Sequence, residues 1–170
     1  MRIIVSGPES SGKTTFSKLL SQQLNCPWVE EYAREYLSLK EGKYEFIDLE
    51  KIAQRQEQIQ SDWEAQEGLI VCDTGLMVIK VWAAYKFDRS IPWLEQQWES
   101  RKKDYYILCK PDIPWEPDPL RENPTDRMKI YDIYKQNFDS LGLDYVSVGG
   151  SLEQRLTRSL DFLQSRIDII

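Results

Sequence analysis

Five short apolar runs alternate with longer amphipathic segments along the chain. The apolar runs predict strands over residues 2–6, 28–30, 69–72, 105–109 and 145–148. Between them, apolar residues recur at helical spacing and predict helices over 13–24, 32–39, 48–67, 76–85, 91–103, 126–141 and from 152 onward. Strands that alternate with helices form parallel sheets through right-handed crossovers, so the pattern predicts an α/β fold with a doubly wound, five-stranded parallel sheet. In such a fold the ligand lies at the carboxyl ends of the strands.

The same pattern predicts how individual helices begin and which faces they bury. Asp48 is expected as the N-cap of helix 48–67, and Ser151 with Gln154 as a capping box for the last helix. The buried face of helix 48–67 is predicted to carry Leu49, Ile52, Ala53, Ile59 and Trp63. In helix 126–141 the corresponding residues are Met128, Tyr131, Tyr134 and Phe138.

One long stretch lacks any periodicity. The segment from Pro111 to Pro124 contains five of the eight prolines, which predicts a loop. We interpret residues 111–127 as a lid-like segment within one domain that takes up the whole chain, residues 1–170.

Composition narrows the class of ligand. The net charge is −6, whereas a polynucleotide-binding domain usually presents a basic face to phosphates. The chain has no histidine and only three, widely spaced cysteines, so a zinc site lacks a ligand set. Any general base has to be a carboxylate, or the protein has none. No apolar stretch has the ~20 residues of a membrane span, and no signal-peptide pattern opens the chain. We therefore expect a cytoplasmic protein that binds a small molecule and neither a polynucleotide nor a membrane; its oligomeric state is not predicted.

The strongest motif follows the first strand. Residues 7–14 read Gly-Pro-Glu-Ser-Ser-Gly-Lys-Thr directly after Ile3-Ile4-Val5, which is a complete phosphate-binding loop in its proper context. Such a loop turns backbone N–H groups toward a phosphate, with positive charge from Lys13 and the following helix, while the Thr14 hydroxyl can bind Mg²⁺. The predicted nucleotide-binding residues are Gly7, Ser10, Ser11, Gly12, Lys13, Thr14 and Thr15. The alternative is a Gly/Ser-rich turn, which the spacing disfavours.

Carboxylates follow two further strands. Asp73 comes directly after the third apolar run, where a carboxylate can support Mg²⁺ beside Thr14; the alternative is an N-cap of the next helix. Glu30 and Glu31 end the second run, where a carboxylate can accept a proton from a substrate hydroxyl. Arg34 lies one helical turn further on and is a candidate for the same site. An ordinary surface ion pair explains these three residues equally well.

The proline-rich segment supplies the remaining candidates. Arg121 and Arg127 flank it, and mobile arginines stabilise the charge of a transferred phosphoryl group when a loop closes. Trp115 lies in the loop itself, so it is expected to stack on a base-like ring, with Asp112 or Asp118 holding ribose hydroxyls. Trp82 and Tyr85 are weaker candidates for the same stacking contact, because their segment is apolar enough to belong to the core.

Taken together, these motifs resemble a known family. The carriers are residues 7–15, Glu31-Tyr32-Ala33-Arg34-Glu35, Cys72-Asp73-Thr74, Asp112-Ile113-Pro114-Trp115, and Asp118-Pro119-Leu120-Arg121 through Arg127. The chain resembles the ribosylnicotinamide kinase domain of the bifunctional bacterial NAD-biosynthesis regulators, and the wider ATPase family built on it, from its start to about Arg155. Gly75 departs from the pattern, where a polar residue is expected.

The resemblance implies a P-loop kinase fold, ATP with Mg²⁺, and phosphorylation of the 5′-hydroxyl of ribosylnicotinamide to nicotinamide mononucleotide. Under it Lys13 binds phosphate, Thr14 and Asp73 serve the metal, and Arg121 and Arg127 belong to a closing lid. The adenylyltransferase and DNA-binding activities of the bifunctional proteins are not implied.

Three hypotheses about function stay open at this point. The first is a kinase of a nucleoside-like small molecule, with ribosylnicotinamide leading. The second is another nucleoside or nucleotide kinase, although thymidylate-type kinases carry arginine where Thr74 stands. The third is a regulatory ATPase that transfers phosphate to no small acceptor. GTP is disfavoured because Cys109-Lys110-Pro111-Asp112 lacks the asparagine that reads guanine.

Overall fold

A single five-stranded sheet forms the centre of the molecule. The computed structural model describes residues 1–167. Its strands are β1 (Arg2–Ser6), β2 (Trp28–Val29), β3 (Ile70–Asp73), β4 (Tyr105–Cys109) and β5 (Tyr145–Val148). They lie in the order β2-β3-β1-β4-β5, and every neighbouring pair is parallel. The predicted α/β fold with a five-stranded parallel sheet is confirmed.

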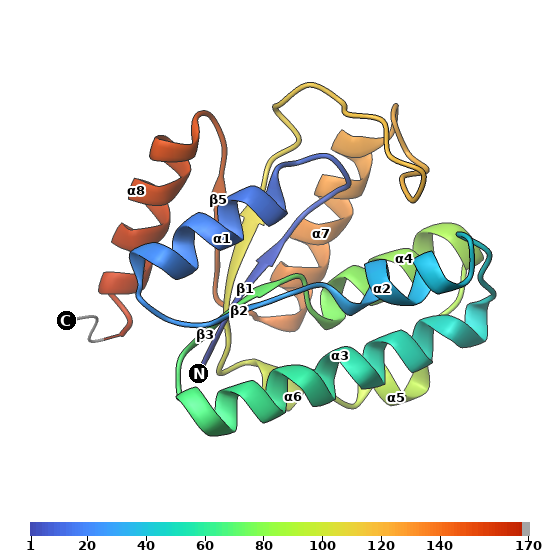
Figure 1. The fold of residues 1–170 in the computed structure, drawn as a ribbon, viewed down its shortest axis with the longest axis horizontal. Coiled ribbons are helices and arrows are strands. Elements are labelled where there is room, and N and C mark those ends of the chain that lie inside the picture. Colours follow the sequence, from blue (N-terminus) through green and yellow to red (C-terminus); the bar gives the residue numbers. More distant parts are fainter. Residues whose placement is uncertain (168–170) are drawn as a thin grey trace.

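Helices cover both faces of the sheet (Figure 1). They are α1 (Lys13–Gln23), α2 (Tyr32–Leu39), α3 (Phe46–Glu67), α4 (Leu76–Phe87), α5 (Pro92–Glu95), α6 (Trp98–Arg101), α7 (Arg127–Leu141) and α8 (Leu152–Gln164). α1 and α8 pack over one face, and the other helices build a larger apolar core on the opposite face. Within residues 1–167, no helix combines the length and the apolar character needed to cross a membrane.

The predicted start of the long helix was wrong by two residues. α3 begins at Phe46 with Glu45 as its N-cap, and Asp48 is the third residue of the helix. The Asp48 carboxylate accepts the backbone N–H of Glu45 at 2.9 Å and the Tyr36 hydroxyl at 2.7 Å. Asp48 therefore caps the helix from inside its first turn, which a search for a preceding polar residue does not detect. The capping box of Ser151 and Gln154 is confirmed.

Other differences between the predicted and the observed helices arise because helical spacing of apolar residues is a limited guide. The helix expected over 91–103 is two short helices, α5 and α6. Trp63 and Met128 were expected in the core, but they are 40% and 58% exposed. Both residues lie near an end of their helix. Helical spacing identifies a face of a helix, but it does not show how far along the helix the neighbouring elements reach.

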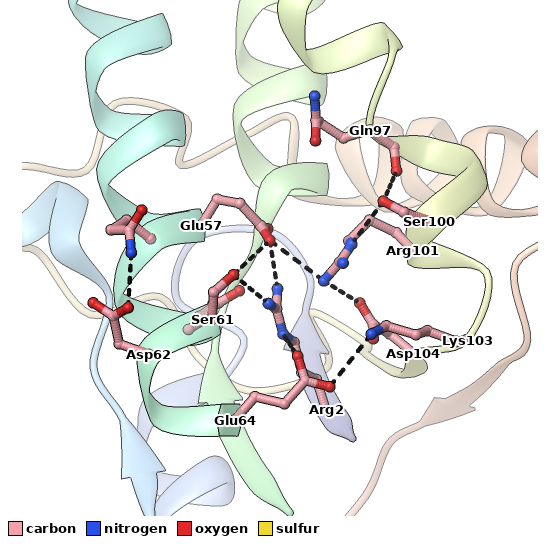
Figure 2. Close-up of polar contacts among 12 residues, drawn as sticks. Arg2, Glu57, Ser61, Asp62, Glu64, Gln97, Ser100, Arg101, Lys103 and Asp104 are labelled. Carbon is pink, nitrogen blue, oxygen red and sulfur yellow. Dashed lines mark hydrogen bonds and ion pairs between the residues drawn. The ribbon is translucent and has the colours of Figure 1, made fainter. Parts of the chain in front are cut away.

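A buried arginine, Arg2, links β1 to α3. It lies at the end of the sheet opposite to the carboxyl ends of the strands. Arg2 is 1% exposed, and Figure 2 shows its side chain between acidic residues of α3. Its Nη1 lies 2.9 Å from Glu57 and its Nε 2.8 Å from Glu64, and its Nη2 donates to Ser61 at 2.8 Å. These partners satisfy all three guanidinium nitrogens of a charge that would be costly to bury alone.

We predict that Arg2→Ala lowers the free energy of unfolding by about 3–5 kcal/mol, because it removes a buried cationic partner from each of two partly buried carboxylates, Glu57 and Glu64. Urea unfolding at pH 7 measures the effect. Arg55→Ala is the matched control, since Arg55 is an exposed arginine on α3, and it should change stability by no more than about 0.5 kcal/mol. Equal effects of the two variants would contradict a structural role for the Arg2 cluster.

Candidate functional site

The loop between β1 and α1 has a shape that depends on glycine. Gly7 adopts φ +142°, and a Cβ atom there would stand 2.6 Å from the carbonyl oxygen of Cys109 in β4. Gly12 adopts φ +79° directly before α1. Only glycine fits both positions without strain. Residues 7–14 can therefore curl over the N-terminus of α1, where the helix dipole favours an anion.

The predicted phosphate-binding residues surround one space. Lys13 Nζ donates to the carbonyl oxygen of Pro8 at 2.7 Å, which holds the ammonium group across the loop. A cavity of about 230 Å³ lies in front of it. The predicted residues that line this cavity are Gly7, Ser10, Ser11, Gly12, Lys13, Thr14 and Thr15. The arrangement gives a phosphate both a positive charge and a row of backbone donors.

Asp73 stands beside this loop. It is the last residue of β3, and the strand register pairs it with Val5 of β1. Its side chain is 2% exposed, and its Oδ1 has no hydrogen-bond partner among the described residues. Burial raises the pKa of Asp73, while a hydrogen bond with the Thr14 hydroxyl opposes this shift. A buried carboxylate oxygen without a partner, next to a hydroxyl, provides the kind of oxygen ligands that Mg²⁺ requires.

The cavity continues from the loop toward an apolar and aromatic wall. This wall comes from α4 and α7, and its members include Val78, Val81, Trp82, Tyr85 and Tyr134. Trp82 and Tyr85 are half-buried, so part of each ring is open to the cavity. The two weaker candidates thus pack on the core, as their apolar segment suggested, and also line the cavity. Aromatic rings on one side and a phosphate loop on the other suit a ligand with a flat ring and a polar end.

Of the two neighbouring glutamates, the structure brings only one into the site. Glu31 lines the cavity, whereas Glu30 is exposed and does not line it. Burial and the nearby charge of Asp73 raise the pKa of Glu31 to about 7, and Lys13 and Arg34 only partly offset them. A carboxyl group with this pKa can take up a proton near neutral pH, as a general base must.

The two arginines of the lid-like segment have different places. Arg121 lines the cavity and donates to the carbonyl oxygen of Glu116. Arg127 does not line it, because its Nη1 donates to the carbonyl oxygens of Ser10 at 3.0 Å and Ile113 at 2.9 Å. Arg127 therefore lies behind the phosphate loop. This position differs from the prediction, which placed Arg127 in a charge-stabilising lid.

Asp112 and Trp115, the other loop candidates, also lie outside the cavity lining. The Asp112 carboxylate pairs with Arg155 and accepts the backbone N–H of Gly150 at 2.7 Å. Trp115 is half-buried, with its ring centre 5.8 Å from the guanidinium of Arg127. Arg34 does line the cavity and forms an ion pair with Asp118 at 3.0 Å. The structure thus unites Glu31, Arg34 and Arg121 with the phosphate loop and leaves Asp112 and Trp115 apart.

Sequence reasoning also missed two residues. Glu9, inside the phosphate motif, accepts the backbone N–H groups of Glu122 and Asn123 at 3.0 and 2.9 Å and so binds the lid-like segment to the loop. Arg155 donates to the carbonyl oxygen of Ser11 at 2.7 Å from α8. Glu9 could have been noticed as the one acidic residue of the motif. No sequence signal connects Arg155 with a residue 144 positions earlier.

Known proteins match this chain at the levels of family and of fold. A family model described as an AAA domain matches residues 2–155. Cytidylate kinase of Aquifex aeolicus (strain VF5) is 41% identical over 58 residues, which are 31% of this chain and 25% of that enzyme. The crystal structure of NadR protein in complex with NR has a TM-score of 0.75 at 21% identity, covering 99% of this chain and 52% of the other.

Two further solved structures are kinases of nucleosides or nucleotides. Thymidylate kinase from Ehrlichia chaffeensis has a TM-score of 0.70 at 15% identity, covering 96% of this chain and 98% of that one. Deoxyadenosine kinase from M. mycoides has a TM-score of 0.67 at 14% identity, covering 97% and 100%. The predicted P-loop kinase fold and the resemblance to NadR in fold are confirmed. The chain spans about half the length of NadR and a quarter of the cytidylate kinase.

We predict that Lys13→Met weakens binding of a non-hydrolysable ATP analogue with Mg²⁺ by about 10- to 100-fold, because one charge-assisted hydrogen bond to phosphate is lost. Isothermal titration calorimetry measures the dissociation constant. Lys18→Met is the matched control, since Lys18 is an exposed lysine of α1. An affinity of Lys13→Met equal to that of the control would remove Lys13 from the phosphate site.

Proposed function

Because the chain belongs to the AAA-domain family of the matching model and has the fold of nucleoside and nucleotide kinases, we propose that it is an ATP-dependent kinase of a nucleoside-like small molecule. One observation carries the proposal. A single cavity is lined by the phosphate loop, by Glu31 and by the aromatic wall of α4. A phosphate donor and a ring-bearing acceptor can thus meet beside a carboxylate.

The donor side is formed by the loop after β1. Its backbone N–H groups and Lys13 would bind the phosphates of ATP, and Thr14 and Asp73 would hold Mg²⁺. When bound, the metal neutralises the charge that develops on the phosphate oxygens. Arg121, which reaches the cavity from the lid-like segment, adds a positive charge near the transferred group.

The acceptor side centres on Glu31. The chain has no histidine, and Glu31 is a carboxyl group at the cavity whose pKa is raised to about 7. In its ionised form it would accept the proton of the acceptor hydroxyl as that oxygen attacks the terminal phosphorus atom of ATP. ADP then leaves with the remaining phosphates in the loop. Arg34, which pairs with Asp118, would favour the ionised form of Glu31 through its nearby positive charge.

We favour ribosylnicotinamide as the acceptor. Its pyridinium ring carries a positive charge, and aromatic faces and carboxylates both attract such a cation. Trp82, Tyr85 and Glu31 offer both kinds of group in one cavity. The motif resemblance supports the same substrate. Another nucleoside as acceptor is the second candidate, and the same assay separates the two.

The test is phosphorylation of a nucleoside panel with ATP and Mg²⁺, with ribosylnicotinamide included and product followed by chromatography. We expect ribosylnicotinamide to give the highest kcat/KM and adenosine, cytidine and thymidine lower values. Preference for another nucleoside would overturn ribosylnicotinamide as the acceptor but would still support a kinase. ATP turnover that no acceptor stimulates would instead support a regulatory ATPase.

Two tryptophan variants locate the acceptor within the same assay. Trp82→Ala should raise the KM of the acceptor by about tenfold with a smaller change in kcat, because a ring contact binds substrate and transition state alike. Trp115→Ala should leave this KM within about twofold, because Trp115 does not line the cavity. The reverse outcome would place the acceptor ring against the lid-like segment.

The pKa of Glu31 predicts a pH profile. A base acts when it is deprotonated, so kcat/KM should rise about tenfold per pH unit below pH 7 and level off above it. Glu31→Gln should lower the plateau by about 10²- to 10⁴-fold and abolish this inflection. Glu30→Gln should keep the inflection, since Glu30 is exposed. An unchanged profile in Glu31→Gln would exclude Glu31 as the base.

A further inference from the structure

Two arginines hold the phosphate loop from its outer side. Arg127 Nη1 donates to the carbonyl oxygen of Ser10 at 3.0 Å. Arg155 Nη1 donates to the carbonyl oxygen of Ser11 at 2.7 Å. One arginine comes from the start of α7 and the other from α8. Consecutive peptide groups of the loop are therefore each bound by a separate guanidinium.

These contacts decide where the loop directs its donors. A trans peptide group is planar, so its C=O and N–H bonds point in opposite directions. With the Ser10 carbonyl drawn outward, the N–H group of Ser11 points to the inner side of the loop. With the Ser11 carbonyl drawn outward, the N–H group of Gly12 does the same. The inner side is where a phosphate binds in a loop of this kind.

Arg155 is built as a fixed support. It is 2% exposed, and its remaining nitrogens donate to the carbonyl oxygen of Gly150 at 3.1 Å, to that of Lys110 at 3.4 Å and to the Asp112 carboxylate. A buried guanidinium with every nitrogen engaged has little freedom to move, because each lost bond would leave a buried N–H group without a partner.

The partner of Arg155 is itself bound to the backbone. Asp112 accepts the backbone N–H of Gly150 at 2.7 Å, and a Cβ atom on Gly149 would collide with its carboxylate. The turns that follow β4 and β5 thus meet at Asp112 and Arg155. Through Arg155 the geometry of these two turns is transmitted to the phosphate loop beside them.

We propose that Arg155, with Arg127 as its counterpart, is a positioning residue that orients the N–H groups of Gly12 and Ser11 toward the phosphates of the nucleotide. Neither arginine lines the cavity, so each acts through the loop backbone. The inference rests on the proposed function only in requiring a polyphosphate ligand, and it holds for any acceptor.

Conservative substitutions provide the test, because lysine keeps the charge but cannot reproduce the planar, several-fold donor geometry of arginine. We expect Arg155→Lys and Arg127→Lys each to weaken binding of tripolyphosphate and of a non-hydrolysable ATP analogue by about 10-fold or more. The probes are titrated by calorimetry, so no acceptor is involved. Arg158→Lys, an exposed arginine of α8, should bind both ligands like the wild type.

A second measurement separates positioning from loss of fold. In ¹⁵N-labelled wild type, tripolyphosphate should shift the amide resonances of Ser11 and Gly12. In Arg155→Lys the shift of Gly12 should shrink while amide signals of the sheet stay in place, and in Arg127→Lys the shift of Ser11 should shrink. Folded variants that bind tripolyphosphate like the wild type would overturn the inference. So would a wild type that binds no tripolyphosphate. If tripolyphosphate binds as expected but no nucleoside is phosphorylated, the proposed kinase activity would be overturned and the inference about Arg155 would stand.

Discussion

The phosphate loop sets the constraint on which the rest of the structure depends. Its N–H groups have to face an open space in which a ligand can bind. Its carbonyl groups are largely buried and therefore need hydrogen-bond donors from the protein. Hydrogen bonds of a helix or sheet cannot supply this one-sided arrangement. The structure meets the requirement with side chains, because Lys13, Arg127 and Arg155 bind the carbonyl oxygens of Pro8, Ser10 and Ser11.

The two ends of the parallel sheet have different roles, one in ligand binding and the other in stability. All five strands end at one edge, where β1 is followed by the phosphate loop and β3 ends in Asp73. Asp73 has an unpartnered buried oxygen there, which lowers stability but leaves a ligand position open. At the opposite edge the buried Arg2 is fully paired with α3. Asp73 thus leaves an oxygen open for a ligand at one end of the sheet, while charge pairing between Arg2 and α3 reinforces the other.

Local chemistry made part of this site predictable. The glycines and Lys13 have fixed spacing after an apolar strand, and Asp73 directly follows another, so their positions follow from strand geometry alone. Trp115, Asp112 and Arg127 lie in or beside a loop without periodicity, and their partners are distant in sequence. Trp82 and Tyr85 were obscured for another reason. Apolar side chains at helical spacing mark a packed face, but whether a neighbour or a cavity covers that face is decided only by tertiary structure.

The segment from Pro111 to Arg127 combines two kinds of contact with different strengths. At its ends, Asp112 and Arg127 are tied to buried or backbone partners that are costly to release. Its middle is held by the Arg34–Asp118 and Lys86–Glu122 pairs, which are partly solvent-exposed and contribute only about 0–1 kcal/mol each. Backbone N–H groups of the middle also donate to Glu9 and to the Ser10 hydroxyl. Opening the middle would break these contacts, whereas the ends would keep the phosphate loop in shape. Arg121 lies in this middle and lines the cavity, so the charge it brings there depends on the contacts of the middle, whereas the orientation of the loop donors depends on those of the ends.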